Sequence, residues 1–193
     1  MTNIYHLIND MQNCEQTVGM SVLEHGVLVH RYYLDLVLHL KYGTVLEYEW
    51  KLPDWVYTFK DQLLLEQLDR VTVQNYQIFH DCGKPYCLQL DEDGKRHFPG
   101  HAHRSYEVWK DLGRPDQECK LMQMDMDIHL LKSDMIESFS HIYECSTLLL
   151  TGLSEIHANA SMFGGIDSTS FKIKWKHLNK KGKAICQKKF KNP

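Results

Sequence analysis

Apolar residues recur with helical spacing along most of the chain. In the segment GMSVLEHGVLVHRYYLDLVLHLKYG, apolar side chains stand at positions 22, 23, 27, 29, 33, 34, 36, 37 and 40, and Gly43 follows as a helix stop. This spacing predicts one long helix that ends at Gly43. Further helices are expected over 53–68, 71–80, 101–112, 115–132, 134–143 and 145–162.

Two segments break the helical pattern. Residues 82–100 are expected to form a loop in which DEDGK makes the tip of a small hairpin. Near the C-terminus, FKIKWKHL alternates apolar and polar residues, NKKGK supplies turn residues and AICQKKF could return as a second strand. The segment GGIDSTS before it is a plausible boundary. We therefore predict an all-α fold, with a helical domain at 1–165 and a small lysine-rich β-hairpin at 166–193.

Composition indicates an ordinary globular protein. Of the 193 residues, 43% are hydrophobic and 24% are charged, and no apolar run reaches the roughly 18 residues that a membrane span needs. The N-terminus has neither a basic lead-in nor a small-residue cleavage site, so no secretory signal is expected. The six cysteines are scattered without a CxxC pair, which favours reduced thiols in a cytoplasmic protein.

Charge is distributed unevenly along the chain. The net charge is −3, yet nine lysines and no acidic residue lie between 171 and 193, so all 25 acidic residues belong to the first 170. One interpretation is a clamp for nucleic-acid phosphates, in which Phe171 and Trp175 stack on unpaired bases. The other is a structural hairpin that packs on the acidic body with its lysines solvated. The pattern leaves both open.

The most informative short motif is FHDCGKP. It places an imidazole, a carboxylate and an ammonium (His80, Asp81 and Lys84) at the end of a predicted helix, because Gly83 and Pro85 are helix-stop signals. This combination suits a metal ion and a phosphate, and twelve histidines in the chain point the same way. The alternative is a helix C-terminus with a favourable His⁺ and a turn-forming aspartate.

The chain resembles a known superfamily over about residues 20–165. FHDCGKP followed by LDEDGKRHFPGHAHRSYEVW is similar to the HD-domain metal-dependent phosphohydrolases. In motif it is closest to the HD domains of bacterial tRNA nucleotidyltransferases (CCA-adding enzymes) and of RNA-repair polynucleotide kinases. VLEHGVLVHRYYLDL resembles the helix with the first histidine, MDIHLLK a later histidine segment and LLLTGLSEIHANA the last helix. The resemblance implies an HD-domain helical bundle.

The resemblance also implies a metal site. Its ligands would be His25, His80, Asp81 and Glu155. His30 competes with His25. Glu155 stands where the superfamily usually has an aspartate, so Asp125 or Asp127 could serve instead. Imidazole and carboxylate ligands suit a divalent ion (Mn, Ni, Co, Fe, Mg or Zn), and the lack of clustered thiols argues against a structural zinc site.

Four further residues are candidates for catalytic roles. Lys84 and Arg104 could contact phosphate oxygens. His101 and His129 could bind a second metal or act as the acid for the leaving oxygen. His101 could instead simply open a helix, and Lys84 could be an ordinary solvated lysine.

These expectations define a function and its competitors. We expect a metal-dependent phosphohydrolase, a phosphodiesterase or phosphatase that acts on a nucleotide or RNA-end phosphate, with a 2′,3′-cyclic phosphate as the first candidate substrate. A (deoxy)nucleotide phosphohydrolase of the nucleotidase or dNTPase kind is the alternative enzyme. The competing class is a catalytically degenerate HD module that only binds a nucleotide or RNA.

Overall fold

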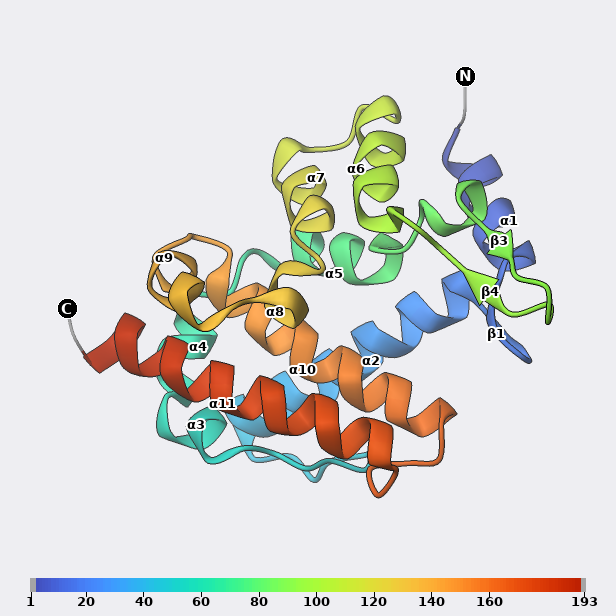
Figure 1. The fold of residues 1–193 in the computed structure, drawn as a ribbon. Helices are drawn as coiled ribbons and strands as arrows, with labels where there is room; N and C mark the ends of the chain where they lie inside the picture. The colour runs from blue at the N-terminus through green and yellow to red at the C-terminus, as the bar shows by residue number, and fades with distance from the viewer. Residues whose placement is uncertain (1–2, 192–193) are drawn as a thin grey trace. The chain divides into compact units, whose positions relative to one another are not determined.

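The computed structural model describes residues 3–191, and most of them are helical (Figure 1). The chain divides into two compact units, each made of two separate stretches. The first unit combines the chain up to Leu28 with Asp69–Met126, and the second combines Val29–Leu68 with the chain from Asp127 onward. The ends of the expected domains, residues 1, 2, 192 and 193, lie outside the described residues.

The first unit contains short helices and two small antiparallel hairpins. Its elements are α1 (Ile4–Asn13), β1 (Glu15–Thr17), β2 (Met20–Ser21), the first turns of α2 (Val22–Tyr42), α5 (Arg70–Phe79), η1 (Lys84–Tyr86), β3 (Gln89–Leu90), β4 (Arg96–His97), α6 (His101–Asp111) and α7 (Asp116–Gln123). Helix α7 packs against both α5 and α6. The predicted hairpin around DEDGK is confirmed, because Gln89 pairs with His97 and Leu90 with Arg96.

Two glycines let backbones approach closely in the first unit. A Cβ on Gly26 would lie 2.0 Å from the carbonyl oxygen of Ile78, so α2 meets the end of α5 backbone to backbone. A Cβ on Gly83 would lie 2.4 Å from the backbone nitrogen of Ser105, so the turn after α5 is pressed against α6. Gly83 is also the glycine of the FHDCGKP motif. The first approach brings His25, the neighbour of Gly26, close to the end of α5, and the second brings the turn that contains Gly83 close to α6.

The second unit is a group of helices around α10. Its elements are the remainder of α2, α3 (Asp54–Thr58), α4 (Lys60–Leu65), α8 (Asp127–Leu130), the 3₁₀ turn η2 (Ser133–Met135), α9 (Ile136–Ser140), α10 (Cys145–Met162) and α11 (Thr169–Lys191). The long helix α11, red in Figure 1, packs against α3, α9 and the orange α10. Most of the residues of α10 are buried, as expected for a central helix.

The predicted β-hairpin at 166–193 is wrong, because residues 169–191 form the single helix α11. The buried residues Phe171, Leu178, Gly182 and Ile185 recur at helical rather than alternating spacing. Ser168 caps the helix, since its hydroxyl accepts a hydrogen bond from the backbone N–H of Phe171 (3.3 Å). NKKGK is therefore not a turn, and the segment packs within the second unit.

The all-α prediction holds for most of the other segments. The helices expected around 22–42, 71–80, 101–112 and 145–162 are present as α2, α5, α6 and α10. The one expected over 53–68 is split into α3 and α4, and the one over 115–132 into α7 and α8 by a turn at 124–126. Of the segment 134–143, only α9 is α-helical.

Within residues 3–191, no helix is both long and apolar enough to cross a membrane. All six cysteines are present as free thiols.

Candidate metal centre

Asp81 is the centre of a cluster of basic side chains in the first unit. Its Oδ2 lies 3.1 Å from His80 Nε2, 3.8 Å from His25 Nε2 and 2.6 Å from Lys84 Nζ. On its other side, Oδ1 lies 3.6 Å from His101 Nε2. The Asp81 side chain is only 2% exposed. The structure thus brings together five of the residues that the sequence motifs single out.

The backbone sets which nitrogen of His80 and of His101 faces the carboxylate. Nδ1 of His80 lies 2.8 Å from the carbonyl oxygen of Gln77, and Nδ1 of His101 lies 2.9 Å from that of Phe98. A carbonyl oxygen only accepts, so each Nδ1 carries the proton and donates it. Nε2 is therefore the nitrogen that each ring turns toward Asp81. This is the arrangement in which a histidine ligates a metal while its other nitrogen is held by the protein.

Asp81 is held in its ionised form. Burial alone would raise the pKa of this carboxyl, but the charges of His80 and Lys84 outweigh burial and hold the pKa well below its usual range. Its Oδ1 is buried and accepts no hydrogen bond from the residues that the structure describes. Burying an anionic oxygen without a hydrogen-bond donor or a cation lowers the stability of the folded protein.

The donor set fits a divalent metal ion. Nε2 of His80 and Oδ2 of Asp81 lie 3.1 Å apart, a distance at which a proton or another cation between them stabilises the pair. Two imidazoles (His25 and His80) and one carboxylate (Asp81) are ligands that first-row divalent ions accept. The residues present in the first unit therefore match the group that the resemblance implies.

His25 belongs to this cluster, and its competitor His30 has another neighbour, Tyr33. His25 precedes Gly26 on α2, and the backbone contact of Gly26 with Ile78 places the His25 ring 5.4 Å from the His80 ring, edge to face. His30 lies further along the helix, in the part assigned to the second unit, where its ring stacks on Tyr33. The geometry favours His25 as the ligand.

Lys84 is buried in this cluster and is not the solvated lysine of the alternative interpretation. Besides Asp81, its Nζ donates to Gln16 Oε1 at 3.0 Å, and it lies 5.3 Å from the centre of the Phe98 ring. The ammonium is therefore aimed at the candidate metal ligands. A direct phosphate contact by Lys84 stays a prediction.

Arg104 is less closely tied to the cluster. It is exposed on α6, donates to Glu107 at 2.9 Å and lies over the ring of Tyr86. The hydrogen bond from Arg104 also lowers the pKa of Glu107. A phosphate-binding role for Arg104 stays a prediction.

The second unit brings the other two candidates together as a pair. His129 Nε2 on α8 lies 2.8 Å from Glu155 Oε2 on α10, and both side chains are partly exposed. Gly152 permits this approach, because a Cβ there would lie 2.8 Å from the neighbouring Ile128 side chain. The ligand role of Glu155 and the acid role of His129 stay predictions.

The two aspartates considered in place of Glu155 have different surroundings. Asp125 is buried in the first unit, and its Oδ1 accepts a hydrogen bond from Tyr76 Oη at 2.7 Å. Asp127 is exposed at the start of α8, and partial burial of its carboxyl raises its pKa. Asp125 thus has a structural partner already.

Three residues that contact the site are not among the site residues predicted from the sequence. Gln16, half-buried on β1, accepts a hydrogen bond from the Lys84 ammonium, and nothing in the local sequence distinguishes it from other glutamines. The carbonyl of Phe98 orients His101, and the FPG segment that follows β4 was the available signal, since Gly100 adopts a positive φ of 68° and is the N-cap residue directly before α6. Ser105 accepts a hydrogen bond from the backbone N–H of Gly83 at 2.9 Å.

Comparison with known proteins adds no further information. No protein-family model, no curated protein and no solved structure matches this chain.

Proposed function

We propose that the protein is a metal-dependent phosphohydrolase of the HD type. The observation that carries the proposal is the pair of imidazoles, His80 and His101, whose Nδ1 atoms are engaged by backbone carbonyls and whose Nε2 atoms face the ionised Asp81. Together with His25, they form a buried donor set at the end of the helix that carries the FHDCGKP motif. The proposed substrate is a nucleotide or RNA-end phosphate, with a 2′,3′-cyclic phosphate first.

Each residue of the cluster has a task in such an enzyme. His25, His80 and Asp81 would hold the metal, which when bound lowers the pKa of water and polarises a phosphoryl oxygen. The Lys84 ammonium keeps Asp81 ionised and offers positive charge to an incoming phosphate. His101 lies beside the other carboxylate oxygen with its Nδ1–H held by Phe98, so the doubly protonated ring would give the leaving oxygen a proton from Nε2.

The first prediction tests the metal and the activity together. Asp81→Asn keeps the side-chain size but removes the charge, so bound Mn, Co or Ni should be lost and metal-stimulated hydrolysis should fall by more than about 100-fold. Metal content is measured after chelation and reloading. Hydrolysis is measured on 2′,3′-cyclic nucleotides, nucleoside monophosphates, nucleoside triphosphates and RNA with a cyclic phosphate end.

Two further variants serve as a second ligand test and as a control. His25→Gln removes one proposed ligand and leaves the Asp81–Lys84 ion pair in place, so it should also lose metal while its circular dichroism stays native. Asp93→Asn, an exposed aspartate in the β3–β4 turn, is the matched control and should behave as wild type. Full metal-stimulated activity in Asp81→Asn would refute the proposal. Metal and nucleotide binding without any hydrolysis would favour the degenerate binding module.

A further inference from the structure

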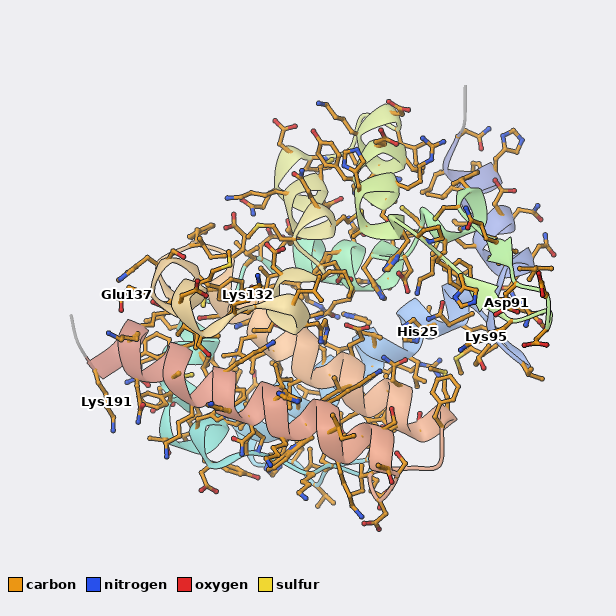
Figure 2. All side chains as sticks on the ribbon, viewed as in Figure 1. His25, Asp91, Lys95, Lys132, Glu137 and Lys191 are labelled. Atoms are coloured by element: carbon orange, nitrogen blue, oxygen red, sulfur yellow. The ribbon has the colours of Figure 1, made fainter. Side chains whose placement is uncertain are left out.

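A basic pocket lies in the second unit between α11 and the segment that joins α8 to α9. It has a volume of about 380 Å³, and no aspartate or glutamate lines it. Its lining residues are Leu131, Lys132, Ser133, Ile136, His177, Lys180, Lys181 and Ala184. Lys132 comes from the connection between α8 and η2 (Figure 2), while the other two lysines come from α11. A concave surface with three ammonium groups is suited to an anion.

One of these lysines is held in place by the fold. Lys181 Nζ donates to the carbonyl oxygens of Ile128 (3.2 Å) and His129 (2.7 Å) at the end of α8. These two hydrogen bonds use two of the three N–H groups of its ammonium. Burial lowers the pKa of Lys181, which shows that its charge is partly withdrawn from water. The pocket therefore contains a fixed cationic donor besides the exposed Lys132 and Lys180.

The pocket continues into a row of lysines along α11. Lys172, Lys176, Lys180 and Lys183 are exposed and follow one another at steps of four, four and three residues, which places them on one face of the helix. At 1.5 Å per residue the row is about 16 Å long. Only the first of the four has an ion pair among the described residues, with the exposed Asp167. The opposite face of α11 is buried in the unit.

We propose that this pocket and lysine row bind the phosphate backbone of a single-stranded nucleic acid. The row is longer than a single phosphate group, so a polyanion can contact more of its lysines at once than a small anion can. The backbone of a single strand is flexible enough to place one phosphate in a pocket of this size. The backbone of a duplex is more rigid and fits the pocket less well. The proposal does not depend on the metal centre.

Contacts on α11 argue against two competing interpretations of this surface, base stacking and membrane binding. Phe171 is buried and is not available for base stacking, and Trp175 is half-buried with Lys51 over its ring and its Nε1–H bound to the Lys51 carbonyl. A membrane surface fits poorly, because the apolar face of α11 is buried and Ile173 is its only large exposed hydrophobic residue. Recognition is therefore expected to be through phosphates and independent of base sequence.

The test is the binding of a fluorescent 12-nucleotide oligouridine RNA, followed by anisotropy between about 50 and 200 mM salt. If about four phosphates are neutralised, log K should fall against log salt with a slope near −3. The double variant Lys132→Ala/Lys180→Ala should weaken binding roughly tenfold and make that slope shallower by about 1.4. Lys132→Arg/Lys180→Arg, which keeps both charges, should bind within about twofold of wild type.

A matched control separates the pocket from general charge. Lys60→Ala/Lys95→Ala removes two exposed lysines that lie outside the pocket and have no ion pair among the described residues, and it should bind like wild type. Wild-type melting temperatures in all variants confirm that the fold is intact. Equal losses in the pocket and control variants, or an unchanged salt slope in the pocket variant, would overturn the proposal. So would sedimentation with anionic phosphatidylserine vesicles in the absence of RNA binding.

Discussion

One buried imidazole in the second unit, His157, is held neutral by its neighbours. Its Nδ1 donates to the carbonyl of Leu153 (2.7 Å), and its Nε2 accepts from the backbone N–H of Lys51 (3.1 Å). The rings of Trp50 and Phe171 lie against it. Burial among these groups lowers the pKa of His157 to about 4. Protonation would have to break the bond from Lys51, because a protonated Nε2 no longer accepts.

This histidine makes stability depend on pH. The pKa of a histidine in the unfolded chain is about 6.5, so between about pH 6.5 and pH 4 the unfolded chain binds the proton more tightly. The free energy of unfolding should therefore fall as the pH drops through this window. The contribution of His157 is roughly 2–3 kcal/mol between about pH 7 and pH 4.5.

The measurement is urea unfolding at several pH values for wild type and for His157→Gln, whose amide can both donate and accept. The difference between the two curves isolates His157 from the other histidines. The curves should run parallel above about pH 7 and converge below about pH 6.5. Parallel curves throughout would show that His157 is not held neutral.

His157 and His80 show why residue type alone does not identify a site. Both are buried, and both donate Nδ1–H to a backbone carbonyl. The difference is at Nε2, which receives a backbone N–H in His157 but faces a carboxylate in His80. The first arrangement is structural and the second suits a cation. The FHDCGKP motif pointed to His80, while nothing in the sequence around His157 reveals that the Lys51 backbone is its partner.

At the scale of elements, Gly182 shows how α11 is packed. Glycine is needed at this position of the helix because the α11 backbone packs directly against the ring of Trp55 on α3. A Cβ at position 182 would lie 2.6 Å from Cε2 and Cζ2 of the indole. Trp55 is itself buried, so its ring has little room to move away.

Gly182→Ala should therefore destabilise the protein even though alanine is the better helix former. Overpacking costs about 1–3 kcal/mol, and the gain in helix propensity returns about 1 kcal/mol, which leaves a net loss of up to about 2 kcal/mol. Urea unfolding measures it. The neighbouring exposed position, in Lys183→Ala, should change stability by less than about 0.5 kcal/mol. A stabilised Gly182→Ala would mean that the close contact with Trp55 is absent.

The same helix shows the limit of prediction from sequence. Alternation over FKIKWKHL favoured a strand, and NKKGK resembled a turn, but Gly182 of that segment packs against Trp55, more than a hundred residues earlier in the chain. Helix α2 was predictable because its apolar spacing extends over several turns, and α10 because a long, mostly apolar segment ends at Gly164-Gly165. The division between α7 and α8 was not, since the apolar pattern continues through the turn at 124–126.

For the whole molecule, the main feature is that both units are discontinuous in sequence. The chain passes between them after Leu28, Leu68 and Met126. A division at residue 165, expected from composition, follows the order of the chain, whereas these units depend on contacts between distant segments. Such contacts leave no local mark in composition. Helix α2 contributes residues to both units without interruption. Because one helix contributes to both units, we expect the two units to unfold together.

Metal binding should consequently raise the melting temperature of the whole chain in a single transition. A ligand that binds only the folded state at about 100 times its Kd stabilises by about 2.7 kcal/mol, which for a chain of this length is a rise of roughly 5–10 °C. Scanning calorimetry with increasing Mn, Co or Ni, and then with excess chelator, measures the rise and its reversal. Asp81→Asn should show no metal-dependent rise, because the carboxylate that His25, His80 and Lys84 surround has lost its charge. Asp93→Asn should shift like wild type. A rise of equal size in Asp81→Asn would place metal binding elsewhere on the protein, and no rise in wild type with any of the three ions would show that the Asp81 cluster holds no metal.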